Sequence, residues 1–187
     1  MKLLQKQSKQ SLQLLYFCLC LVGIALTALA LFTPNWKALR SGSISMEQGL
    51  LFECDICAAF YDDTSVYVKA VIGCMGAAGI LQIICLMTVV VSCFVKKTRA
   101  SRILLLSVAV FNTLVILLLL ASIITYAITE YAGTDGVSVG LSFMVACASL
   151  ILNICSTVFA IFAYKRASSA QKEDTTSIAS NTYNTEY

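Results

Sequence analysis

Residues Ile103–Thr129 have the sequence ILLLSVAVFNTLVILLLLASIITYAIT, in which no Asp, Glu, Lys or Arg interrupts 27 positions. Three other stretches, residues 10–36, 70–95 and 136–164, also lack these charged residues. Each is longer than the ~20 apolar residues that cross the ~30 Å hydrocarbon layer of a membrane. Over the whole 187-residue chain, 59% of residues are hydrophobic and only 12% are charged. The sequence therefore predicts a membrane protein with four spans, and it excludes a soluble single-domain enzyme and a disordered chain.

The four spans should be helices, because the membrane interior offers backbone groups no water and only helices or closed barrels satisfy them. Barrel strands need only ~10 residues, far fewer than these stretches contain. We therefore expect an all-α membrane protein, a four-helix transmembrane bundle, with spans at residues 12–33, 68–95, 103–129 and 137–164. The apolar part of the first span is too long for a cleaved signal peptide, so we expect it to remain as a signal anchor.

Lysine and arginine near the helix ends predict the orientation, since these residues collect on the cytosolic side. Ten of the thirteen lie before the first span, between spans two and three, or after span four: Lys2, Lys6, Lys9, Lys96, Lys97, Arg99, Arg102, Lys165, Arg166 and Lys172. The other side has three basic and seven acidic residues: Lys37, Arg40, Lys69, Glu47, Glu53, Asp55, Asp62, Asp63, Glu130 and Asp135. Both termini should therefore be cytosolic. The net charge of +3 indicates topology and attraction to anionic lipid, not nucleic-acid binding.

The remaining segments follow from this topology. We expect a cytosolic N-terminus at residues 1–11, a cytosolic link at 96–102, a small second outer loop at 130–136 and a disordered cytosolic tail at 165–187. The tail is rich in Ser, Thr, Asn and Ala and lacks hydrophobic periodicity. Only the first outer loop, residues 34–67, is long enough to fold into a structure of its own.

Within the first outer loop, residues 38–40, 43–46 and 49–54 are separated by turn residues and predict short strands of a small extracellular β-sheet. The loop also contains Cys54 and Cys57. Because the outer side is oxidising and only two residues separate the cysteines, we favour a disulfide between them. A redox-active C-x-x-C is an alternative that lacks the usual strand–helix context. A zinc site would need two more ligands in a chain that has no histidine.

The loop carries, in order, Trp36, the pair Gly49-Leu50, Cys54 and Cys57. With four spans, cytosolic termini and a large first outer loop, these residues resemble the claudin and peripheral myelin protein superfamily. Leu51 stands where that signature has a second tryptophan, and Cys57 follows Cys54 more closely than in most claudins. The loop is similar in length to that of the epithelial and peripheral myelin protein branch, and an invertebrate claudin-like member fits.

The resemblance implies a left-handed four-helix bundle that carries a small extracellular β-sheet. It also implies a tryptophan that packs at the bilayer surface near the Gly-Leu segment and a disulfide that ties neighbouring strands together. The residues alone leave two interpretations of Trp36. A lone tryptophan beside Pro34, at a helix end, suits the membrane interface where indole rings concentrate. The alternative is a packing role specific to the fold.

Small residues in spans two and four should let helices approach closely: Ala70, Gly73, Gly76, Ala77, Gly79, Gly136, Gly140, Ala146, Ala148 and Ser149. We expect them to pack the bundle against itself, with contact to another membrane protein as the alternative. Gln82, Asn112 and Asn153 each need a hydrogen-bonding partner, and interhelical bonds are the expected use. The charge-free spans argue against a proton relay, a voltage sensor or a transport site.

Seven cysteines lie in or beside the spans, and most should be small core residues: Cys18, Cys20, Cys74, Cys85, Cys93, Cys147 and Cys155. Cys93 lies three residues from Lys96 at the cytosolic boundary, a position that permits S-palmitoylation. The chain ends in Thr185, Glu186 and Tyr187, and such a C-terminus can add a strand to a scaffold domain of the PDZ type.

Two functions are compatible with this organisation. The first is a claudin-like cell–cell adhesion or junction protein of the plasma membrane, which self-associates in cis or in trans and organises contacts or a paracellular barrier. Its outer acidic surplus would favour cations. The apolar residues of the first outer loop are the candidates for contact: Leu51, Phe52, Ile56, Phe60 and Tyr61. The alternative is an auxiliary subunit of an ion channel or receptor. We expect no enzyme activity, cofactor or metal site, because no groups with that chemistry converge.

Overall fold

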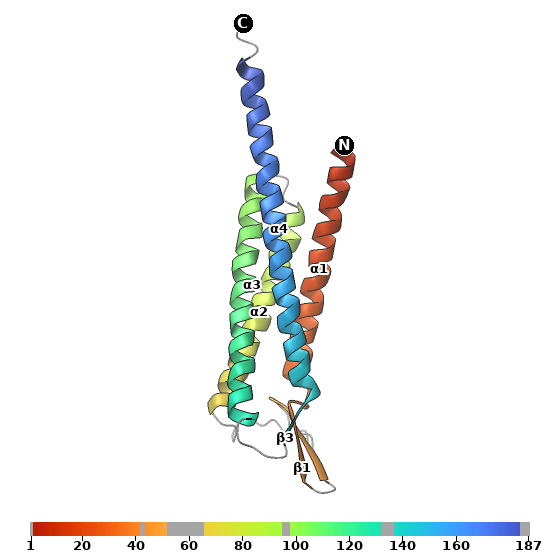
Figure 1. Cartoon of the computed structure of the whole chain (residues 1–187), viewed down its shortest axis with the longest axis vertical. Helices are drawn as coiled ribbons and strands as arrows, with labels where there is room; N and C mark the ends of the chain where they lie inside the picture. The colour runs from red at the N-terminus through yellow and green to blue at the C-terminus, as the bar shows by residue number, and fades with distance from the viewer. Residues whose placement is uncertain (1, 42–43, 52–65, 95–97, 132–136, 184–187) are drawn as a thin grey trace.

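The computed structural model describes residues 2–41, 44–51, 66–94, 98–131 and 137–183. Within these ranges, four long helices form the body of the molecule: α1 (Lys2–Phe32), α2 (Val66–Phe94), α3 (Thr98–Tyr126) and α4 (Leu141–Tyr183) (Figure 1). Four stretches, which lie in these helices and in the residues directly after α3, are long and apolar enough to cross a membrane: Leu14–Phe32, Val66–Ser92, Ile103–Thr129 and Leu141–Phe162. The predicted four-span helical protein is confirmed.

The outer surface of the bundle is apolar. Large hydrophobic side chains are exposed on every helix, among them Phe32 of α1, Met87 of α2, Leu117 of α3 and Met144 of α4. A soluble bundle would place polar side chains at such positions. Lipid tails cover apolar side chains without a penalty, so the structure and the composition agree on a membrane environment.

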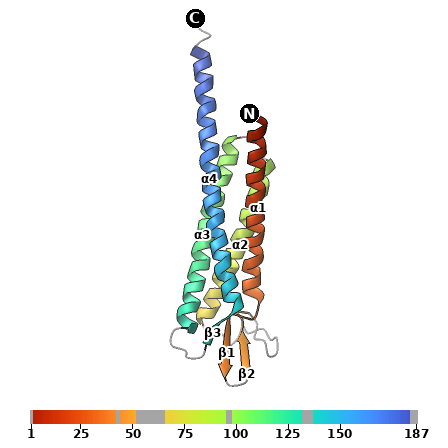
Figure 2. The same cartoon turned by 45° about the vertical axis from the view of Figure 1, so that its right-hand side comes forward.

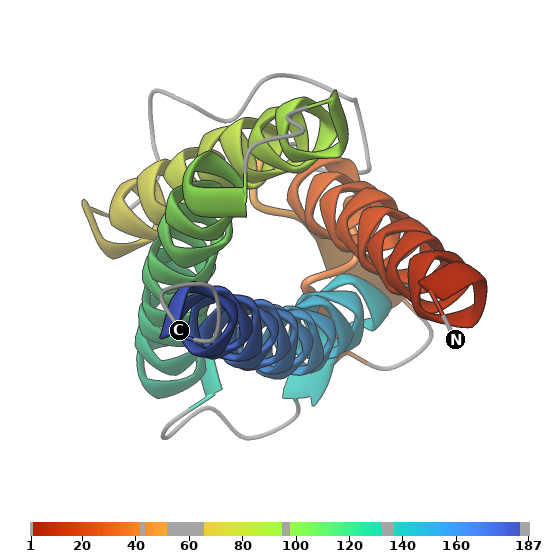
Figure 3. The same cartoon turned by 90° about the horizontal axis from the view of Figure 1, so that it is seen from above.

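The helices stand in a ring in chain order, and each packs against its two neighbours (Figure 3). Helix α2 runs antiparallel to α3, and α3 to α4, as their short connections predict (Figure 1). The start of α1 and the end of α4 lie at the same end of the bundle, opposite the strands (Figure 2). We call these two ends the termini end and the sheet end.

Three short strands pair at the sheet end of the described structure: β1 (Lys37–Ser41), β2 (Ile44–Gln48) and β3 (Val137–Val139). Strand β1 is central, and both neighbours run antiparallel to it. Lys37 lies opposite Gln48 of β2 on one side and opposite Val139 of β3 on the other. Because β1 follows α1 and β3 precedes α4, the sheet joins the two chain segments that leave neighbouring helices.

The start of α4 differs from the sequence prediction. The fourth span was expected to begin at residue 137, but Val137–Val139 forms β3 and α4 begins at Leu141. β-Branched valines favour strands, and Gly140 between the two elements is a poor helix former. The predicted strand at residues 49–54 also differs, because the part of it that the structure describes, residues 49–51, is not a strand.

The two chain ends also differ from the sequence prediction. Residues 165–187 were predicted to be disordered, but α4 continues without a break to Tyr183. The continued segment contains no glycine or proline and several good helix formers, so nothing in it stops a helix that the span has already nucleated. Helix α1 likewise begins at Lys2, within the segment expected to precede the first span. The turn η1 (Ala127–Tyr131) ends the third helical segment in a π-helical form.

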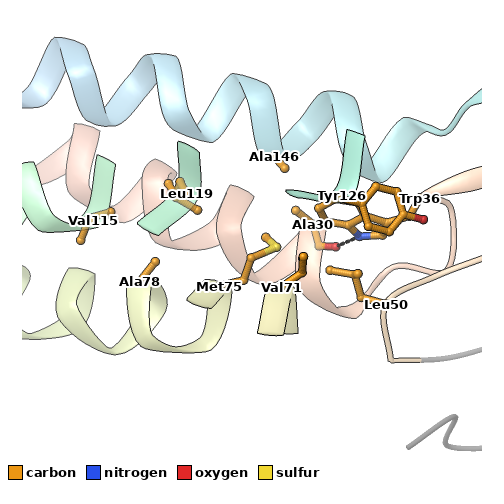
Figure 4. Close-up of a cluster of buried hydrophobic side chains, with 10 residues drawn as sticks. All are labelled: Ala30, Trp36, Leu50, Val71, Met75, Ala78, Val115, Leu119, Tyr126 and Ala146. Carbon is orange, nitrogen blue, oxygen red and sulfur yellow. Dashed lines mark hydrogen bonds between the residues drawn. The ribbon is translucent and has the colours of Figure 1, made fainter. Parts of the chain in front are cut away.

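Buried hydrophobic side chains form two clusters along the bundle. The cluster nearer the sheet end, which we call the sheet-end cluster, contains Ala30, Trp36, Leu50, Val71, Met75, Ala78, Val115, Leu119, Tyr126 and Ala146 (Figure 4). The cluster nearer the termini end contains Tyr16, Cys20, Val89, Val108 and Ala160. Of the two clusters, only the sheet-end cluster includes residues from outside the helices, so it fastens the segment that follows α1 to the bundle.

Candidate functional site

Trp36 lies just beyond the end of α1 and is fully buried, with 0% of its surface exposed. Its indole N–H donates a hydrogen bond to the carbonyl oxygen of Ala30 at 2.6 Å (Figure 4). Its ring meets the ring of Tyr126 edge-to-face, with the centroids 4.7 Å apart, and that of Phe143 at 5.8 Å. Trp36 therefore packs in the core among α1, α3 and α4, and the interpretation as an interfacial anchor is wrong.

The end of α1 explains why the indole binds there. The last carbonyl groups of a helix have no N–H in a following turn to accept from. Here the backbone N–H of Thr33 donates to the carbonyl oxygen of Leu29 at 2.9 Å, and the indole of Trp36 supplies the donor for Ala30. Pro34 cannot continue the helix, so the chain turns and Trp36 folds back over the last turn. The buried indole N–H is satisfied by the same contact.

Gly140 lies against the chain segment that precedes Trp36. Its backbone N–H donates to the carbonyl oxygen of Trp36 at 3.0 Å. A Cβ atom placed on Gly140 would lie 2.6 Å from the carbonyl carbons of Asn35 and Trp36 and would overlap the carbonyl oxygen of Asn35. Since the obstacle is backbone, no side chain can turn away to make room, and only glycine fits this position.

Ser142 completes this contact. Its backbone N–H donates to the carbonyl oxygen of Asn35 at 2.9 Å, and its hydroxyl oxygen accepts from the backbone N–H of Asn35 at 3.1 Å. The Ser142 hydroxyl also bonds the hydroxyl of Thr33 at 2.6 Å. We call residues 33–36 and 140–142 the seam, because they join the end of α1 to the start of α4. The sequence indicated Gly140 only as part of a small-residue pattern and gave no signal for Ser142.

Leu50 belongs to the same buried cluster as Trp36. It is 1% exposed and lies among Ala30, Val71 and Met75 (Figure 4). The next residue, Leu51, is only partly buried. Two members of the family motif therefore lie together in the sheet-end cluster, and both ends of the β1–β2 segment are held by the bundle.

Several predicted site residues lie outside the described part of the chain. These are Phe52, Cys54, Ile56, Cys57, Phe60, Tyr61, Thr185, Glu186 and Tyr187, and nothing is described for the side chain of Cys93. The predicted disulfide, contact residues, palmitoylation site and scaffold-binding C-terminus therefore stay predictions. Gly49, the third described member of the family motif, is partly buried beside Leu50.

The polar residues of the spans bond to other helices, as predicted. Nε2 of Gln82 in α2 donates to Oδ1 of Asn153 in α4 at 3.2 Å. Nδ2 of Asn112 in α3 donates to the hydroxyl oxygen of Tyr16 in α1 at 2.7 Å. These side-chain bonds connect helices at two levels of the bundle, where lipid tails give the helices no hydrophobic reason to associate.

The small residues of α2 do not pack the bundle as expected. A Cβ atom placed on Gly73, Gly76 or Gly79 would meet no other atom within 4 Å, so none of the three allows another described helix a close approach. By contrast, Ala146 and Ser149 of α4 are fully buried and do fill the interior. The prediction is therefore wrong for the three glycines of α2 and correct for this part of α4.

The prediction that most cysteines of the spans are core residues also holds for only some of them. Cys20 and Cys85 are buried free thiols, as predicted. Cys18 and Cys155 are exposed on the outer surface of the bundle, and Cys74 and Cys147 are intermediate. A thiol is small and weakly polar, so it is tolerated on either face of a helix in lipid, and its sequence position does not fix its burial.

Comparison with known proteins adds the family. The sequence matches the family model described as a claudin-like tight junction protein over residues 5–177, which includes all four spans and the seam. A comparison with curated proteins gives no significant match. The match extends over most of the chain, including all four of the membrane-length helices. The protein belongs to the claudin-like family of tight junction proteins.

Proposed function

We propose that this protein is a cell–cell adhesion protein of the plasma membrane, which organises junctional contacts through its first outer loop. The observation that carries the proposal is the joint burial of Trp36 and Leu50 in a chain of the claudin-like family. These two side chains flank residues 37–49 and fix that segment to the helices at both ends. A segment held in this way presents the same surface on every copy, so little freedom is lost when two copies bind.

The proposed orientation places the sheet end outside the cell. The start of α1, the end of α2, the start of α3 and the end of α4 lie at the opposite end of the bundle (Figure 1). Ten of the thirteen lysines and arginines belong to these helix ends or lie next to them in the sequence, and such residues concentrate on the cytosolic side. We therefore propose cytosolic termini and an outer face formed by the β1–β2–β3 sheet and the rest of the first outer loop.

The proposed contact surface begins at Leu51. Leu50 is buried in the sheet-end cluster, whereas Leu51 next to it keeps part of its surface accessible. We extend the surface to the apolar residues that follow in the loop: Phe52, Ile56, Phe60 and Tyr61. A disulfide between Cys54 and Cys57 would hold this stretch in one shape. The acidic surplus of the outer loops would favour cations over anions in any passage between cells.

On the cytosolic side we propose two further points of attachment. Cys93 follows the second span close to Lys96 and is suited to acylation at the inner membrane surface. The C-terminus, Thr185 to Tyr187, is suited to a scaffold domain that binds a terminal carboxylate and adds a strand. Either attachment would concentrate the protein at a membrane region where partners of the same kind collect.

Expression in cells that lack junctions tests the proposal. The protein should accumulate where two expressing cells touch, and it should remain there without any added channel or receptor. A diffuse surface signal that changes only when a channel is co-expressed would instead identify an auxiliary subunit.

Two variants of neighbouring residues locate the contact surface. Leu51→Ser should reach the cell surface and lose its accumulation at contacts, because it changes an accessible residue. Leu50→Ser should reduce the amount of folded protein, because it places a hydroxyl in the sheet-end cluster. Unchanged accumulation of Leu51→Ser would remove that residue from the proposed surface.

A further inference from the structure

The four spans of the bundle differ in length. The span of α1, Leu14–Phe32, has 19 residues, and that of α4, Leu141–Phe162, has 22 residues. The third span, Ile103–Thr129, has 27 residues. At about 1.5 Å per residue, these spans measure ~28, ~33 and ~40 Å along the helix axis. The part of α2 that follows Lys69, residues 70–94, carries no charge and measures ~38 Å.

The ends of the two long spans are apolar and exposed. Phe94, at the end of α2, is 79% exposed, and Ile103 and Ile128, near the two ends of the third span, are 62% and 63% exposed. Ile103 and Ile128 are ~37 Å apart along the helix axis. The span of α1 is instead bounded by polar residues, Gln13 before it and Thr33 after it. In a hydrocarbon layer of ~30 Å, the outermost apolar side chains of α2 and of the third span would lie among the lipid headgroups.

A tilt of the whole molecule does not remove this difference. A span of ~40 Å fits a hydrocarbon layer of ~30 Å only at a tilt of ~40°, the upper end of the range for membrane helices. Even if the span of α1 is counted from Leu12, which gives ~32 Å, the same tilt reduces its height to ~24 Å. The helices are also joined, because Asn112 of α3 bonds to Tyr16 of α1 and Gln82 of α2 bonds to Asn153 of α4. The bundle therefore has a long apolar side and a short one at any common tilt.

The longest and the shortest spans lie on opposite sides of the bundle. The helices stand in a ring in chain order, so α1 and α3 face each other across the ring, with α2 and α4 between them (Figure 3). Both sides contact lipid, because Val22 of α1 is 48% exposed and Leu117 of α3 is 55% exposed near the middles of their spans. The surrounding lipid therefore meets an apolar surface whose height increases from α1 to α3.

We propose that the α2–α3 side of the protein binds phospholipids with longer acyl chains than the α1 side binds. A mismatch between an apolar span and the hydrocarbon layer costs free energy, so lipids of matching length collect beside each side. Long chains cover Phe94, Ile103 and Ile128, whereas shorter chains bring the headgroups to the polar residues that bound the span of α1. The preference depends on chain length, and it does not require the proposed adhesion.

Quenching of tryptophan fluorescence by brominated lipid tests the two sides separately. Leu117→Trp places a reporter on α3, and Val22→Trp places one on α1, both at exposed positions near mid-span. The single native tryptophan, Trp36, is buried and gives the same background in both variants. The full chain is reconstituted in vesicles of equal parts dierucoylphosphatidylcholine, which has long chains, and dipalmitoleoylphosphatidylcholine, which has short ones. In one sample the long-chain lipid is brominated at its double bonds, and in a second sample the short-chain lipid is brominated.

The quantity measured is the quenching by the brominated long-chain lipid divided by the quenching by the brominated short-chain lipid. This ratio should be at least about twofold higher for Leu117→Trp than for Val22→Trp. Both reporters lie near mid-span, so the depth of the bromine atoms affects them equally. Equal ratios for the two variants would overturn the proposal.

A second pair of variants ties the preference to the length of the span. Ile124 is 47% exposed, so its side chain can be changed with little loss of packing. In the Leu117→Trp protein, Ile124→Lys shortens the charge-free run to residues 103–123, and the ratio should fall to that of Val22→Trp. Ile124→Ala is the matched control, which keeps the run uncharged and should leave the ratio unchanged. A ratio that stays high in Ile124→Lys would show that the preference does not come from span length, and it would overturn the proposal.

Discussion

Gly140 and Asn35 touch backbone to backbone at the seam between α1 and α4. A Cβ atom on Gly140 would lie 2.6 Å from the carbonyl carbon of Asn35. This contact brings the last turn of α1 and the first turn of α4 together at the level where the chain leaves the helices for the sheet. Strands β1 and β3 leave this point as direct neighbours, so the geometry of the seam is passed on to the sheet.

Gly140→Ala should therefore disrupt the seam. The added methyl group meets backbone that cannot rotate away, and we expect the free energy of unfolding to fall by about 3 kcal/mol or more. Thermal unfolding in detergent, followed by circular dichroism, measures the change. Gly79→Ala is the matched control, and its effect should stay below about 1 kcal/mol because its Cβ meets nothing. Equal stability of the two variants would show that the close approach is not required.

The indole hydrogen bond of Trp36 can be separated from its packing. Trp36→Phe keeps a ring near Tyr126 and Phe143 but removes the donor for the carbonyl oxygen of Ala30. We expect a loss of about 1–3 kcal/mol for this variant and about 3–5 kcal/mol for Trp36→Ala, which also loses the packing. Chemical unfolding of purified protein gives both numbers. No difference between Trp36→Phe and the unaltered protein would mean that Ala30 finds another donor.

The bond between Tyr16 and Asn112 should join α1 to α3 with a modest energy. A double-mutant cycle with Tyr16→Phe and Asn112→Leu isolates the interaction between the two side chains. Hydrogen bonds of this kind within membranes contribute about 0.6 kcal/mol on average and up to ~1.7 kcal/mol. A coupling energy in that range is expected from unfolding in mixed micelles. Strictly additive effects would show that the two residues do not depend on each other.

The disulfide prediction concerns Cys54 and Cys57, which lie outside the described residues. If the loop is outside the cell, the two thiols should be oxidised to one bond within the loop. Mass spectrometry of unreduced protein, digested after the free thiols are blocked, should find no blocked thiol at either position. Blocked thiols at both positions would contradict the prediction and weaken the placement of this loop outside the cell.

Sequence reasoning located the spans because the physical cause is local: without charged residues over 26 or more positions, each stretch can only cross the membrane. It also paired the polar residues with other helices, because a buried amide such as that of Gln82 has no other choice. It could not decide the role of Trp36, whose burial depends on Tyr126 and Phe143, far away in the sequence.

The wrong predictions also concern features that a sequence pattern does not determine. Gly73 and Gly140 have the same chemistry, yet Gly140 touches backbone and Gly73 faces open space. A small-residue pattern shows which helix faces permit close approach, and only the arrangement of the helices shows which of them are used. The helical end of α4 was missed because a lack of hydrophobic periodicity shows only that a segment has no buried face. It does not show that a helix must stop.

The most direct test of the adhesion proposal is a mosaic culture of expressing and non-expressing cells. The measurement is the fluorescence of the labelled protein at borders between two expressing cells, divided by twice that at borders where only one cell expresses it. Binding between copies on facing cells predicts a ratio well above one, because partners exist on both sides only at the first kind of border. A ratio of one would show that each cell places the protein at its borders without a partner opposite, and it would contradict the proposed adhesion.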